Sequence, residues 1–158
     1  MTLTATIHHF AIGLCDVDRG VYETLALKVA RHPSEAEDHL VTRVLAYCLE
    51  LTEGLNFSRG LSEPDEPALS VRDLTGRLRA WIDVGAPDAA RLHRASKAAP
   101  RVAVYTHKSP AQLLRQLGGV RIHQRRMQFD LSVTERHLFV SIRGATLSGA
   151  VERLALAA

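Results

Sequence analysis

Three acidic residues at one end of a predicted β-hairpin are the side chains in this sequence whose types and spacing could do chemistry. The hairpin turns at 75–76, where Thr-Gly is a pair typical of tight turns. Antiparallel pairing around that turn sets Asp83 opposite Pro67, close to two further acids. The sequence therefore predicts that Asp65, Glu66 and Asp83 crowd together at the open end of the hairpin.

Crowded carboxylates are a typical ligand set for a hard divalent cation. Like charges held close together repel one another unless a positive charge lies between them. Mg²⁺ and Mn²⁺ accept oxygen ligands of this kind, so the three acids predict a site for one of these ions. The alternative is that residues 62–67 form an acidic, proline-rich surface loop that binds no ion. Spacing alone does not decide between the two interpretations.

A locally basic stretch follows the hairpin and favours a polyanionic partner. Arg91, Arg94 and Lys97 recur every three residues, which places them on or near one face of a helix. The whole chain has a formal net charge of +3 and a pI near 9.2, values compatible with binding to DNA or RNA. The alternative is an ordinary solvated helix face, and so small a net charge leaves the partner undecided.

Other sequence signals exclude several classes of protein. The sequence has no P-loop, no Gly-x-Ser-x-Gly and no Gly-x-Gly-x-x-Gly motif, so nucleotide-binding folds and serine hydrolases are not indicated. Cys15 and Cys48 have no partner at metal-binding spacing, and His8 and His9 point to opposite faces of a strand. No secretion signal or membrane segment is indicated, so we expect a cytoplasmic protein. Trp81 could stack a nucleic-acid base or pack in the core.

Hydrophobic periodicity and turn residues predict the elements that must position these side chains. A helix from Ser34 to about residue 52 begins with a capping-box pattern, exposes Glu35, Asp38 and Arg43, and ends before Gly54. The other predicted strands are 2–14, 21–30, 57–61, 68–74, 77–84, 101–106, 120–123, 126–133, 137–142 and 147–156, and the other helices are 86–99 and 109–117. This order predicts a mixed α/β or α+β fold with an N-terminal β-hairpin and C-terminal β-strands, in a single domain over 1–158.

Four ordered blocks of the sequence resemble the YaeQ family. The blocks are LKVARHPS at 27–34, GLSEPDEPAL at 60–69, WIDVGAPD at 81–88 and RLHRA at 91–95. The resemblance covers most of the chain and implies a fold of the PD-(D/E)XK nuclease superfamily. Its restriction-endonuclease-like core is a helix, a three-strand meander, a second helix and a further strand. The element order predicted for residues 34–106 agrees with that core.

The resemblance also implies which residues would form a metal-dependent nuclease site. Carried over by position, the metal ligands would be Asp65 or Glu66, Asp83, and Glu35 from the first helix. The superfamily lysine should stand two residues after Asp83, and here that position is Gly85. The resemblance implies that a cation from the next helix replaces it. The candidates are Arg91, Arg94 and Lys97.

Two hypotheses about function follow. The first is hydrolysis of phosphodiesters in DNA or RNA, dependent on Mg²⁺ or Mn²⁺. Its catalytic groups would be Asp65, Glu66, Asp83, Arg94 and Lys97. The second is a non-catalytic module on the same fold that binds nucleic acid or protein. It is motivated by Gly85 and by Arg94, which stands where the family is expected to have lysine and keeps its proton at working pH.

Overall fold

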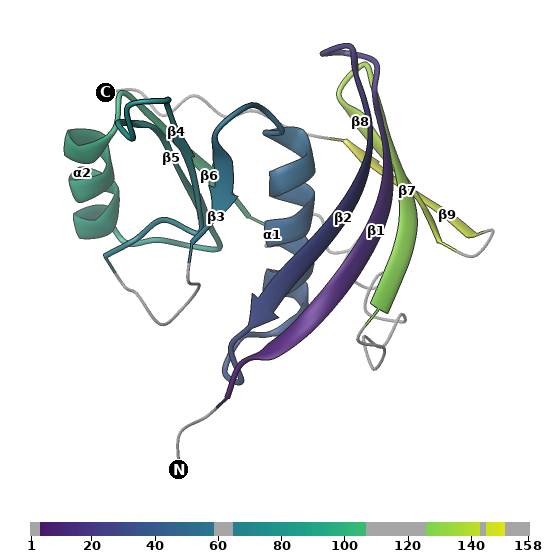
Figure 1. Ribbon diagram of the computed structural model, residues 1–158, viewed down its shortest axis with the longest axis horizontal. Helices are drawn as coiled ribbons and strands as arrows, with labels where there is room; N and C mark the ends of the chain where they lie inside the picture. The colour runs from purple at the N-terminus through teal and green to yellow at the C-terminus, as the bar shows by residue number, and fades with distance from the viewer. Residues whose placement is uncertain (1–3, 59–64, 107–125, 143–144, 151–158) are drawn as a thin grey trace. The chain divides into compact units, whose positions relative to one another are not determined.

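The chain forms two compact units in the computed structural model, which describes residues 4–58, 65–106, 126–142 and 145–150 (Figure 1). The first unit comprises Met1–Ile7 and Val29–Leu114, and the second comprises His8–Lys28 and Arg115–Ala158. The helix predicted at 109–117 and the strand predicted at 120–123 lie outside the described residues. The single domain over 1–158 stays a prediction.

The second unit is built on a five-stranded sheet with the order β2-β1-β7-β8-β9. In β1, Phe10, Ile12 and Leu14 are buried and alternate with more exposed residues, as expected for a strand with one face in a core. β1 pairs with β7 in parallel, and β8 pairs antiparallel with both β7 and β9. The strands are β1 Thr6–Asp16, β2 Val21–Arg31, β7 Arg126–Thr134, β8 His137–Ile142 and β9 Ala145–Ala150.

The first unit contains the candidate site residues. Its sheet has the order β3-β4-β5-β6, with antiparallel pairing from β3 to β5 and parallel pairing between β5 and β6. The parallel pair is joined by α2, because parallel strands need a crossover connection. Its elements are α1 Glu37–Leu49, β3 Leu55–Phe57, β4 Leu69–Arg72, β5 Leu78–Val84, α2 Ala89–Ala98 and β6 Arg101–Tyr105.

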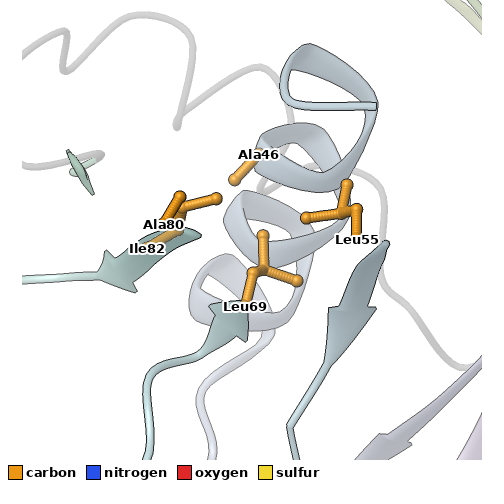
Figure 2. Packing of buried hydrophobic residues seen from close by; sticks show 5 residues of the cluster. All are labelled: Ala46, Leu55, Leu69, Ala80 and Ile82. Atoms are coloured by element: carbon orange, nitrogen blue, oxygen red, sulfur yellow. The ribbon is translucent and has the colours of Figure 1, made fainter. Parts of the chain in front are cut away.

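The two helices of the first unit cover opposite faces of its sheet (Figure 1). On one face, Ala46 of α1 packs against strand residues that are at most 6% exposed. Figure 2 shows this cluster, whose other members are Leu55, Leu69, Ala80 and Ile82. On the other face, Trp81 of β5 packs against Ala95 and Ala99 beneath α2. Trp81 and Asp83 therefore lie on the α2 side of the strand.

The start and end of α1 differ from the prediction. The helix is capped at Ala36 without a side-chain hydrogen bond, and the Ser34 hydroxyl bonds the His32 ring instead, so the predicted capping box at Ser34 is wrong. Gly54 has a left-handed φ of 82°, but α1 already ends at Leu49. A Cβ on Gly54 would stand 1.9 Å from the Arg72 carbonyl oxygen. The glycine is required by close backbone approach to β4.

The β4–β5 hairpin turns over a longer loop than Thr75-Gly76 predicts. The turn runs from Asp73 to Gly76, where the Gly76 N–H donates to the Asp73 carbonyl at 2.8 Å and Gly76 has a φ of 82°. The register is also displaced from the prediction by one residue, since Leu69 pairs with Ile82. Asp83 consequently faces Ala68, and the predicted opposition to Pro67 is wrong.

The fold is a mixed α+β arrangement with two helices and two mixed sheets in the described parts of the chain. Neither of these helices is long and apolar enough to cross a membrane.

Candidate functional site

Asp83 is a buried carboxylate near the end of β5, held by an arginine of α2. The residue is 2% exposed. Both of its oxygens accept hydrogen bonds from Arg91, with Nε 2.8 Å from Oδ2 and Nη2 2.8 Å from Oδ1. The Ala68 N–H lies 3.4 Å from Oδ1. Paired hydrogen bonds between a guanidinium and a carboxylate are strong and geometrically specific. The positive charge of Arg91 therefore balances the negative charge of Asp83.

Arg91 of α2 contacts both β5 and the segment that precedes β4. Its Nη2 also donates to the Glu66 carbonyl at 2.7 Å, and its guanidinium carbon lies 5.6 Å from the centre of the Trp81 ring. The hydrogen bonds to Asp83 raise the pKa of Arg91 above its usual value, despite the opposing effect of burial. Arg91 lies in the first turn of α2, where the N-cap residue Asp88 accepts a hydrogen bond from the Arg91 N–H at 2.7 Å. The interpretation of Trp81 as a core residue is the one that the packing favours.

The other predicted acids of the hairpin lie at the surface. Arg94 Nη1 donates to Asp65 Oδ1 at 2.7 Å, but the side chains of these residues are 59% and 80% exposed. Glu66 is exposed as well and contributes its backbone carbonyl to Arg91. Lys97 lies in the last turn of α2 with an exposed side chain. The two arginines of α2 thus hold the carboxylates of Asp83 and Asp65 and the backbone carbonyl of Glu66.

Glu35 belongs to a second ion pair, just before α1. Its side chain is 1% exposed, and Arg43 donates to both oxygens, from Nε to Oε1 at 2.8 Å and from Nη2 to Oε2 at 2.9 Å. His39 Nδ1 lies 2.7 Å from Oε1. Burial alone would raise the pKa of Glu35, but the hydrogen bonds from His39 and Arg43 outweigh it and hold that pKa below its usual value. Glu35 is therefore ionised and paired.

Sequence reasoning placed Glu35 and Arg43 on the exposed face of α1, and that prediction is wrong. Arg43 is 2% exposed, donates to the Ala30 carbonyl at 2.8 Å and lies 5.8 Å from the centre of the Phe57 ring. The signal was present in the helical period, because position 43 falls three residues after the fully buried Leu40. A buried arginine at such a position needs a buried acid as its partner.

Gly85 has a structural reason to be glycine. Its φ is +100°, a backbone conformation that residues with a Cβ rarely adopt, and its N–H donates to the Tyr105 carbonyl at 2.8 Å. A Cβ at this position would lie 3.7 Å from Cδ2 and 4.0 Å from Nε2 of the His39 ring. The backbone conformation thus disfavours lysine here, and His39 occupies the neighbouring space.

The residues as placed do not fit a bound metal ion. Within the described ranges, no group of three or more His, Cys, Asp and Glu side chains is arranged to hold a metal. Both buried acids described in the first unit already accept paired hydrogen bonds from arginine, at Asp83 and at Glu35. The guanidinium group occupies one lone pair on each oxygen and sets a positive charge beside the carboxylate, which disfavours coordination of Mg²⁺ there. The metal site stays a prediction.

Comparison with known proteins places the chain in a family. The sequence profile of the family described as "YaeQ protein" matches residues 1–123. The chain belongs to the YaeQ family. Two relatives named "Uncharacterized protein YaeQ", from Salmonella typhi and Escherichia coli (strain K12), are 38% and 37% identical to it over 111 residues. These alignments cover 70% of this chain and 61% of each relative, so the chain spans less than two thirds of the curated relatives' length.

Solved YaeQ structures share the fold. The crystal structure of YaeQ protein from Pseudomonas syringae matches with a TM-score of 0.84 and 32% identity, covering 91% of this chain and 92% of that one. The YaeQ protein from Xanthomonas axonopodis pv. citri matches with a TM-score of 0.82 and 29% identity, covering 92% and 95%. The arginine-held carboxylates therefore belong to a YaeQ-family fold.

Proposed function

We propose that this YaeQ-family chain is a non-catalytic nucleic-acid-binding module. The observation that carries the proposal is the pairing of both buried acids of the first unit with arginine, at Asp83 and at Glu35. A metal-dependent nuclease needs carboxylates whose oxygens are available to the ion. Here those oxygens hold α2 and α1 in place, so the acids act as structural anchors.

We also propose that the first unit has a restriction-endonuclease-like core. The element order α1, β3, β4, β5, α2, β6 follows the helix, three strands, helix and strand that the family resemblance implies. That order supports a restriction-endonuclease-like core. A shared fold does not require shared chemistry, because catalytic groups can be lost while the scaffold remains.

Charge supports nucleic acid as the partner. The chain carries a net charge of +3 with a pI near 9.2. Arg94 and Lys97 are exposed on α2. Exposed cations attract the phosphate backbone regardless of base sequence, and such binding weakens steeply with salt. We therefore expect salt-dependent binding that is indifferent to chelators.

Metal-dependent phosphodiester hydrolysis is the second candidate. It is favoured by the burial of Asp83 and Glu35, which are 2% and 3% exposed, since buried charged residues often mark functional sites. It requires Asp83 to exchange Arg91 for Mg²⁺ or Mn²⁺. Asp65, Glu66, Arg94 and Lys97 would then complete the catalytic groups.

One experiment separates the two candidates. The protein is incubated with labelled single- and double-stranded DNA and RNA, with Mg²⁺, with Mn²⁺ and with EDTA, and both binding and cleavage are measured. We expect binding in all three conditions and intact substrate. Metal-dependent cleavage that disappears in Asp83→Asn, but persists in the exposed control Asp38→Asn, would overturn the binding proposal and establish the second candidate. The absence of both binding and cleavage would overturn both.

A further inference from the structure

The β4–β5 hairpin tip, residues 72–79, presents an exposed leucine among arginines on a fixed turn. Resting on the proposed nucleic-acid binding, we propose that this tip enters the major groove of duplex DNA. Leu74 contacts base edges there, while the neighbouring arginines bind phosphates beside the groove.

Hydrogen bonds within residues 73–77 fix the shape of the turn. Asp73 Oδ1 accepts from the Thr75 N–H at 3.0 Å, the Thr75 hydroxyl at 2.6 Å and the Arg77 N–H at 3.0 Å. The hydrogen bond from the Thr75 hydroxyl is the main cause that lowers the pKa of Asp73, so its carboxylate stays charged. The Asp73 N–H donates to the Arg77 carbonyl at 3.0 Å. A preorganised turn loses little entropy when it binds.

Leu74 is held out in solvent by that turn. It is 94% exposed, the largest exposure among the large hydrophobic residues of the described chain. A single exposed leucine is common on protein surfaces and does not by itself indicate a binding site. Here it stands at the outermost position of a rigid turn between cationic residues. Apolar side chains in that setting are used by DNA-binding proteins to contact thymine methyl groups and base edges.

The charge of the tip fits a phosphate backbone. Arg72, Arg77 and Arg79 are all exposed, and Asp73 is the one acid among residues 72–79. The Asp73 carboxylate is engaged within the turn. Guanidinium groups match phosphate oxygens in paired hydrogen bonds. These arginines are separate from Arg91 and Arg94, which are engaged with the carboxylates of the candidate site.

The shape of the tip selects one kind of duplex. The major groove of B-form DNA is about 12 Å wide and admits a two-stranded β-ribbon. The major groove of A-form RNA is too deep and narrow for side chains to read. A hairpin tip that enters a major groove therefore binds duplex DNA more tightly than duplex RNA of the same sequence.

The test measures fluorescence anisotropy with a short labelled DNA duplex, and with its RNA counterpart, over a range of salt concentrations. We expect Leu74→Ala to weaken DNA binding about tenfold and to leave RNA binding unchanged. Arg77→Ala and Arg79→Ala should each reduce the salt dependence of DNA binding by about one phosphate contact. Tyr22→Ala and Lys28→Ala are matched controls, since both residues are exposed on β2 and should not affect binding.

Each outcome separates the tip from the proposed function. If the wild-type protein binds neither duplex, the tip proposal is overturned, and the proposed function is overturned with it only if single-stranded DNA and RNA are not bound either. If it binds DNA and the tip variants bind as tightly as the wild type, the tip proposal alone is overturned. Equal affinity for the DNA and RNA duplexes would likewise overturn entry into the major groove. Thermal unfolding of Leu74→Ala should match the wild type, because the side chain makes little contact.

Discussion

The two buried carboxylates of the first unit are held in nearly the same way and differ in what surrounds their arginines. Glu35 and Asp83 each accept paired hydrogen bonds at 2.8 to 2.9 Å. The Arg43 side chain beside Glu35 is 2% exposed, whereas the Arg91 side chain beside Asp83 is 24% exposed. The two pairs share the same hydrogen-bond geometry, but water reaches the arginine of the Asp83 pair and not that of the Glu35 pair.

This difference separates a permanent structural pair from one that solvent or a ligand can compete for. Removing one partner of a fully buried pair leaves an uncompensated charge in a medium of low dielectric. Where water reaches one partner, it can solvate part of the charge that is left behind. The Glu35 pair should therefore dominate stability, and the Asp83 pair should be the one that responds to its surroundings.

The largest expected effect comes from Arg43→Met, which keeps the volume of the side chain but leaves Glu35 without its main partner. We expect the free energy of unfolding to fall by about 3–5 kcal/mol. Chemical denaturation of both proteins measures the change. Arg101→Met is the control, since Arg101 makes an equally paired contact with Glu50 while its side chain is 52% exposed. Similar losses in the two variants would contradict the role assigned to burial.

The second largest effect is expected for Glu35→Gln, which should change how the stability of the fold depends on pH. The folded pKa of Glu35 lies below its unfolded value, so the stability that this group contributes is present above the unfolded pKa, about 4.3. That contribution is lost as the pH falls through the folded pKa. We expect Glu35→Gln to be less stable than the wild type at neutral pH, with a smaller further loss on acidification. Unfolding midpoints between neutral pH and acid test this. Parallel curves for the two proteins would show that Glu35 does not drive the acid response.

A smaller effect is expected for Arg91→Met at the more accessible pair. Asp83 would lose both guanidinium hydrogen bonds and keep the long one from Ala68, so we expect a loss of about 1–3 kcal/mol. Denaturation in the presence and absence of Mg²⁺ gives a second readout. If Asp83 is only an anchor, Mg²⁺ leaves the stability of the variant unchanged. A rise in unfolding midpoint with Mg²⁺ would show that the carboxylate can take a metal once the arginine is gone.

The smallest effect is expected for Arg94→Ala. Its partner Asp65 is 80% exposed and the arginine itself is 59% exposed, so water and salt screen the pair. We expect the free energy of unfolding to change by about 0–1 kcal/mol. Thermal unfolding at low and high salt measures it. A loss as large as that in Arg91→Met would mean that exposure is not what separates these pairs.

Much of the fold could be predicted from the sequence, because hydrophobic periodicity and turn residues act locally. Most predicted strands and both helices described in the structure were placed within a few residues of their observed ends. The errors occur where a distant contact decides the local structure. Gly54 was assigned to a helix end, whereas its conformation is required by the approach of Arg72. The one-residue register shift likewise comes from an irregularity in the pairing between Val71 and Arg72, which the turn residues do not specify, since Arg72 still pairs with Leu78 beside the loop.

The sequence named several of the charged residues that the structure pairs, but not their pairings. The sequence located Asp83 and the cations of α2, and the structure joins Arg91 to Asp83 and Arg94 to Asp65. Which arginine reaches which acid depends on side-chain direction across the sheet face, and a one-dimensional spacing does not contain that information. Glu35 was named as a metal ligand through family resemblance. Its partner Arg43 was missed because an arginine in a helix was read as a solvent-facing residue.

Gly85 limits how this scaffold could be redesigned. Introducing a lysine by Gly85→Lys would place a side chain on a backbone with a φ of +100°, a strain on the order of 1–3 kcal/mol before any new contact forms. The His39 ring already stands next to that position from α1, 3.7 Å from where a Cβ would lie. A side chain added at residue 85 would therefore start beside α1, whereas Asp83 lies on the α2 side of β5 and is already paired with Arg91. An engineer who wants another cation beside Asp83 would do better to leave the glycine untouched and vary α2.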